Sequence, residues 1–139
     1  MKCLGMDLGT KTLGLAKSDR LGMISSPFKV LRYESTDELV NEVIEIISSE
    51  HIEVLVLGYP KNMNNSLGDA VKRTMDFKEA LEKKSGMEIN LIDERLSTVE
   101  AQSYLLEGDV SRKKRHQVVD SIAASIILDT YLRKVKKGD

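Results

Sequence analysis

Several residue types are scarce in this chain, and each scarcity excludes a class of protein. The single cysteine, Cys3, excludes an intrachain disulfide and a multi-cysteine zinc site. Tryptophan is absent and aromatic residues make up 4% of the chain, which argues against a broad platform for stacking bases. No apolar run approaches the roughly 20 residues of a transmembrane helix. We therefore expect a protein of the reducing cytoplasm with no membrane partner.

An excess of charge of one sign is also missing. Lys and Arg total 21 and Asp and Glu total 22, so the formal net charge is -1. That balance alone argues against a strongly basic nucleic-acid binder, but it conceals an asymmetry. From Ser111 onward the net charge is +5, whereas the first 110 residues carry -6. The length of 139 residues predicts a single domain over residues 1–139.

The apolar pattern predicts an α/β fold. Three strands joined by tight turns, an antiparallel meander, are expected at Lys2–Leu8, Thr12–Ser18 and Pro27–Arg32. The predicted elements that follow are a helix behind the capping box at Ser35, a buried strand at Val54–Leu57, a helix at Gly68–Lys84, a strand at Glu88–Ile92, a helix from Ser97 to near Gly108 and a last helix at about Gln117–Leu132. This order implies a mixed five-stranded sheet flanked by helices.

Three acidic residues are candidates for a functional site. Asp7 ends an otherwise apolar strand, where an unpaired carboxylate is costly, and Glu94 follows the fifth strand, where open α/β sheets gather ligand-binding groups. Asp120 lies on the last helix, which is apolar almost all round and is therefore expected to be buried. Each acid also has a structural interpretation: bonds to the glycine turn, a charged loop balanced by Arg95, and a favourable position near the helix dipole.

A site built from carboxylates, without a Cys or His cluster, favours a hard divalent cation. Mg²⁺ takes oxygen ligands and keeps positions for water and phosphate oxygens. Two such ions can hold an attacking water and a leaving oxygen in line across a phosphodiester. Asp7, Glu94 and Asp120 are therefore predicted as catalytic residues and metal ligands for phosphoryl chemistry.

Basic residues near these acids are candidate substrate contacts. The run Arg112–Arg115 is predicted to be a loop leading into the Asp120 helix, where its cations would neutralise phosphates; a solvated loop is the alternative. The expected contacts are Lys113, Lys114 and Arg115, together with Lys11, Lys61, Asn62 and Arg95. Simple turn chemistry would also account for Lys61 and Asn62. We expect recognition of backbone and shape.

Four motifs occur in order along nearly the whole chain: Asp7-Leu8-Gly9-Thr10-Lys11, Gly58-Tyr59-Pro60-Lys61-Asn62-Met63, Asp93-Glu94-Arg95-Leu96-Ser97-Thr98 and Val119-Asp120-Ser121-Ile122-Ala123-Ala124. Together they resemble the YqgF/RuvX family of pre-16S ribosomal RNA nucleases, which are related to RuvC-type Holliday junction resolvases of the RNase H-like superfamily. The Asp-Glu-Arg-Leu-Ser-Thr block is specific. Asp-Leu-Gly-Thr is weak, because sugar kinases and chaperone ATPases also use it.

The resemblance implies a fold, a metal site and a substrate. It implies an RNase H-like sheet, Mg²⁺ or Mn²⁺ bound by the three acids, and cytoplasmic processing of the 5′ end of pre-16S ribosomal RNA, with ribosomal precursor particles as partners and branched DNA as the other substrate. The chain departs from the family pattern at Asn65-Ser66, which replaces a glycine-containing turn, and at His116-Gln117, where further lysine is usual. These departures bear on loop shape and substrate grip.

Alternatives from other classes stay open. A non-catalytic RNA-binding factor of ribosome assembly would keep the same fold and acids. An ATPase built on Asp-Leu-Gly-Thr needs two such domains around a nucleotide, and this chain supplies one. Resolving a DNA junction would require a dimer, whereas trimming one RNA strand would not, and we expect a monomer or a weak homodimer.

Overall fold

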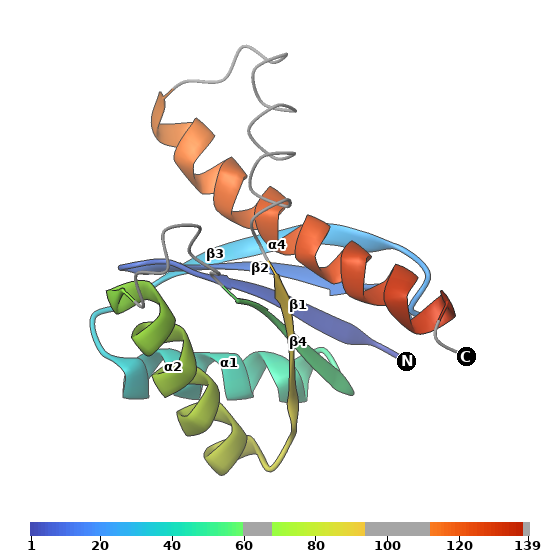
Figure 1. The fold of residues 1–139 in the computed structure, drawn as a ribbon, viewed down its shortest axis with the longest axis horizontal. Coiled ribbons are helices and arrows are strands. Elements are labelled where there is room, and N and C mark those ends of the chain that lie inside the picture. Colours follow the sequence, from blue (N-terminus) through green and yellow to red (C-terminus); the bar gives the residue numbers. More distant parts are fainter. Residues whose placement is uncertain (60–67, 94–111, 138–139) are drawn as a thin grey trace.

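A mixed sheet lies at the centre of the fold (Figure 1). The computed structural model describes residues 1–59, 68–93 and 112–137, with the side chains of 93, 112–120, 136 and 137 outside the description. The strands are β1 (Cys3–Leu8), β2 (Thr12–Ser18), β3 (Ser25–Arg32), β4 (Val54–Tyr59) and β5 (Ile89–Asp93), and their order is β3-β2-β1-β4-β5. The first three pair antiparallel, and β1, β4 and β5 run parallel, so the predicted five-stranded topology is confirmed.

Helices cover both faces of this sheet. In Figure 1, α1 (Thr36–Ser49) and α2 (Asp69–Ser85) lie on one face and α4 (Arg112–Lys137) crosses the other. The capping box is present as predicted, because the Ser35 hydroxyl accepts a hydrogen bond from the Glu38 backbone N–H at 3.2 Å. Within the described ranges, no helix is both long and apolar enough to cross a membrane.

The two faces of the sheet bury separate apolar clusters. On the side of α1 and α2, the cluster includes Leu4, Met6 and Leu8 of β1. On the side of α4, the strand residues Cys3, Ala16, Val56 and Ile92 pack with the helix residues Ala124, Ile127, Leu128 and Leu132. Side chains of a strand alternate between faces, so Cys3, Gly5 and Asp7 all lie on the α4 face.

The last helix departs from the sequence prediction in two ways. It begins at Arg112, so the expectation that Arg112–Arg115 form a loop ahead of a helix at Gln117 was wrong. Lys and Arg are good helix formers, and extending a helix that is already anchored on the sheet adds a hydrogen bond for each residue. The helix is also not buried all round, because Thr130, Arg133 and Lys134 are exposed on its outer side.

Gly5 permits a very close approach between β1 and α4. A Cβ atom at position 5 would lie 2.7 Å from Leu128 Cβ and 2.9 Å from the Ala124 carbonyl oxygen. Both distances are shorter than those between real Cβ atoms and their non-bonded neighbours. The two neighbouring atoms are a backbone oxygen and a Cβ, which cannot move aside by rotation of a side chain. Any side chain at this position therefore forces α4 away from the sheet.

We predict that Gly5→Ala lowers the free energy of unfolding by about 1–3 kcal/mol, the usual cost of overpacking a core. Urea denaturation followed by circular dichroism measures this change. Thr130→Ala, on the exposed side of the same helix, is the control and should stay within about 0.5 kcal/mol of wild type. Equal stabilities of Gly5→Ala and wild type would contradict the close packing.

Candidate functional site

The carboxyl ends of three parallel strands lie at one edge of the sheet. Met6 pairs with Leu57, and Leu57 pairs with Leu91, so β1, β4 and β5 end at similar levels. Asp7 comes directly after Met6, and Glu94 comes directly after the last residue of β5. Ligand-binding groups in open α/β sheets gather at this edge.

Asp7 is half-buried on the α4 face of this edge. Its partner in the neighbouring strand is Gly14, which has no side chain to cover the carboxylate. Leu8, the next residue, is buried on the opposite face of the sheet. The strand therefore presents one carboxylate toward α4 from an otherwise apolar segment.

The structure places the other predicted residues to different extents. Asp120 lies on α4, one turn before Ala124, with its side chain outside the description. Lys113, Lys114 and Arg115 are in the first turns of α4, with their side chains likewise undescribed, and Lys11 is exposed in the turn between β1 and β2. Lys61, Asn62, Glu94 and Arg95 lie outside the described residues. Among the described side chains, no three Asp, Glu, His or Cys residues gather into a metal-binding cluster.

The turn that follows Asp7 is held by Tyr33. The Gly9 N–H donates to the Thr12 carbonyl oxygen at 2.7 Å, which closes the turn. Tyr33 contributes two further bonds: its hydroxyl donates to the Gly9 carbonyl oxygen at 2.7 Å, and its N–H donates to the Lys11 carbonyl oxygen at 3.0 Å. Partial burial raises the pKa of the Tyr33 phenol, and the positive charge of Arg73 on α2 opposes that shift.

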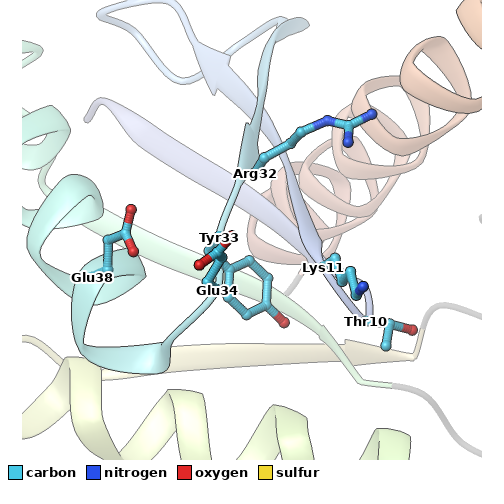
Figure 2. Close-up of a pocket in the computed structure, with 6 residues that line it drawn as sticks. All are labelled: Thr10, Lys11, Arg32, Tyr33, Glu34 and Glu38. Carbon is cyan, nitrogen blue, oxygen red and sulfur yellow. The ribbon is translucent and has the colours of Figure 1, made fainter.

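A cleft of about 710 Å³ opens beside this turn. Its lining residues are Thr10, Lys11, Arg32, Tyr33, Glu34 and Glu38 (Figure 2). Figure 2 shows the Arg32 guanidinium directed toward α4, with Glu38 on the far side of the cleft on α1. Charge is therefore divided across the cleft, with its cations toward the β1–β2 turn and α4.

Arg32 and Tyr33 were not among the residues that the sequence singled out. The strand pattern contains part of their signal, since Arg32 ends the third predicted strand and Tyr33 follows it. It becomes informative only with the pairing of Arg32 to Thr12, which brings the end of β3 beside the turn after Asp7.

Solved structures define the class of fold. The structure titled Thermus thermophilus RuvC in complex with Holliday junction substrate superposes with a TM-score of 0.60 at 16% identity, covering 99% of this chain and 96% of that chain. The fowlpox virus Holliday junction resolvase gives a TM-score of 0.57 at 13% identity, covering 96% of this chain and 99% of that one. At these identities the likeness concerns the fold, which is the RNase H-like fold of RuvC-type resolvases.

Sequence comparison gives the family. The model of the RuvX family, described as Holliday junction resolvase, matches residues 1–134. A protein of Natranaerobius thermophilus named "Putative pre-16S rRNA nuclease" is 42% identical over 140 residues, covering 100% of this chain and 99% of that protein. The chain therefore belongs to the RuvX family, as its four motifs indicated, and it is a nuclease that hydrolyses phosphodiester bonds.

We predict that Tyr33→Phe lowers the free energy of unfolding by about 1 kcal/mol, because the Gly9 carbonyl oxygen loses its hydrogen-bond donor. Chemical denaturation of the purified variant measures this value. Tyr131→Phe is the matched control, since the Tyr131 hydroxyl makes no hydrogen bond within the described part of the chain. If both substitutions change stability equally, the Tyr33 hydroxyl does not hold the turn.

Proposed function

We propose that this chain is a divalent-metal-dependent endonuclease that cleaves structured RNA, with the 5′ end of pre-16S ribosomal RNA as its substrate. Asp7, Glu94 and Asp120 form its acidic site. The observation that carries the proposal is the way in which α4 crosses β1. Moving along β1 toward Asp7 corresponds to moving along α4 toward Asp120.

The direction of this crossing follows from contacts between the two elements. Tyr131 packs near Cys3 in the apolar cluster on this face, and Gly5 lies against Leu128 and Ala124. Moving forward along β1 therefore corresponds to moving backward along α4. Residues two apart in a strand, or four apart in a helix, lie on the same face of that element. Two residues beyond Gly5 on β1 is Asp7, and four residues before Ala124 on α4 is Asp120, so we expect these two positions to face each other.

The donor set suits Mg²⁺ or Mn²⁺. All three residues offer carboxylate oxygens, which hard divalent cations prefer, and the residue paired with Asp7 across the sheet is a glycine, which adds no side chain beside the carboxylate. When bound, the cation supplies a water of lowered pKa and neutralises charge that develops on the phosphate. The packing of Gly5 against α4 keeps Asp7 and Asp120 in position relative to each other. The basic residues described next bind the substrate.

The basic start of α4 is the proposed substrate contact beside this site. Arg112–Arg115 precede Asp120 by one to two helical turns, so phosphates bound there lie near the acids. Four positive charges in the first turns oppose the helix dipole, and an anionic ligand would relieve that repulsion. Lys61, Asn62 and Arg95, which follow β4 and β5 in the sequence, remain proposed contacts.

The choice of RNA rests on the relatives at about two-fifths identity, whose name specifies pre-16S ribosomal RNA. Branched DNA is the second candidate, because the family description specifies Holliday junctions. Junction resolution needs two copies of the site on paired strands. Comparing cleavage of a pre-16S RNA fragment and of a four-way DNA junction, together with the mass of the protein in solution, separates the two.

We predict that Asp7→Asn and Asp120→Asn each lower the rate of Mg²⁺-dependent RNA cleavage by at least about 100-fold, because each removes a ligand worth several kcal/mol in the transition state. Cleavage is measured on an end-labelled pre-16S RNA fragment, and binding of the same RNA is measured in parallel. Binding should persist in both variants.

Asp129→Asn is the matched control for these variants. Asp129 lies on the same helix as Asp120 and pairs with Arg133 at 2.9 Å on the outer surface, so its loss should leave cleavage near the wild-type rate. An Asp120→Asn variant as fast as wild type would refute the acidic site. RNA binding by wild type without metal-dependent cleavage would instead favour the non-catalytic assembly factor.

A further inference from the structure

Arg32 lies on the same face of the sheet as Asp7, at the same edge. It pairs with Thr12 across β2 and β3, and Gly14, two residues further along β2, pairs with Asp7. Leu13, between them, is buried in the cluster on the opposite face, so Thr12, Gly14 and Arg32 face α4. Two strand spacings and one pleat separate Arg32 from Asp7, a Cα distance of about 12 Å.

The Arg32 side chain is available to an external ligand. It is exposed, and it forms no ion pair within the described ranges although Glu34 and Glu38 line the same cleft. Figure 2 shows its guanidinium turned away from Glu38 and toward α4. The cation is thus presented on the side of the cleft that leads to Asp7.

A second cation lines the same cleft. Lys11 is exposed in the turn after Asp7 and lines the cleft with Arg32. An anion beside the β1–β2 turn therefore meets positive charge from two elements, namely the turn and β3.

The chemistry of the cleft favours a phosphodiester backbone over a base. A guanidinium binds phosphate oxygens through paired donors, and lysine adds a point charge. The aromatic ring in the cleft is Tyr33, whose hydroxyl is already bonded to the Gly9 carbonyl oxygen. Glu34 and Glu38 repel phosphate on the α1 side of the cleft. A nucleic-acid strand would therefore pass beside Arg32 and Lys11.

We propose that Arg32, together with Lys11, binds a backbone phosphate of the substrate a few nucleotides from the bond that is cleaved. The cleft beside Tyr33 then holds the substrate strand at the point where that strand leaves the acidic site. This inference rests on the proposed function, because it takes the substrate to be a nucleic acid that passes Asp7. It extends the contact surface from the start of α4 across β1 and β2 to β3.

Binding of a fluorescein-labelled RNA hairpin with a single-stranded extension tests the contact. Fluorescence anisotropy is measured over a series of salt concentrations, in an Asp7→Asn background that keeps the RNA intact. Adding Arg32→Ala should weaken binding by about 3- to 10-fold at low salt and reduce the slope of log K against log salt by about 0.7, as expected for one lost phosphate contact on a single strand. Arg32→Lys should recover part of the loss.

Arg20→Ala is the matched control, because Arg20 is an exposed arginine in the turn between β2 and β3, at the opposite end of the sheet. It removes the same charge and should leave both the affinity and the slope unchanged. If Arg32→Ala and Arg20→Ala have equal effects, the positive charge acts only through the net charge of the protein and the proposed contact is overturned.

Replacing single phosphates of the RNA by neutral methylphosphonates then locates the contact. A methylphosphonate at one position of the RNA should weaken binding to the protein that carries Arg32, and the same replacement should not weaken binding to the Arg32→Ala variant any further. The absence of any such position would overturn the inference. Failure of the proposed function gives a different result. In that case Asp7→Asn cleaves as fast as wild type, whatever the affinity measurements show for Arg32.

Discussion

The contact between Gly5 and α4 is the constraint on which the rest of the site depends. Because position 5 has no side chain, the carbonyl oxygen of Ala124 and the Cβ of Leu128 can lie directly on β1. This sets both the height and the register of α4 over the sheet. Asp7 follows Gly5 by one pleat and Asp120 precedes Ala124 by one turn, so the acidic site proposed above depends on this single packing contact.

A second set of interactions organises the surface beside Asp7. Tyr33 ties the end of β3 to the turn after Asp7, through its hydroxyl and its backbone N–H. The same two hydrogen bonds fix Lys11 relative to Arg32. Local electrostatics, rather than the net charge of -1, thus determines where a polyanion can approach: cations face α4 and the turn, and carboxylates face α1.

Much of the fold could be predicted from the sequence because its signals are local. Alternating or continuous apolar runs placed the strands within about two residues, and the hydroxyl of Ser35 made the capping box visible. The start of α4 was misjudged because a run of cations beside a helix N-terminus is unfavourable locally, and packing further along the helix outweighs it. Asp7 could be found as a carboxylate in an apolar strand. Arg32 and Tyr33 could not, because their position depends on the pairing of β3 with β2.

The most direct test of this account is a crystal structure of the protein grown with Mn²⁺, with anomalous scattering used to locate the metal. An anomalous peak is expected between the carboxylates of Asp7 and Asp120, with Glu94 as a further ligand. Carboxylates of Asp7 and Asp120 that point to different parts of the surface, with Mn²⁺ bound elsewhere or nowhere, would contradict it.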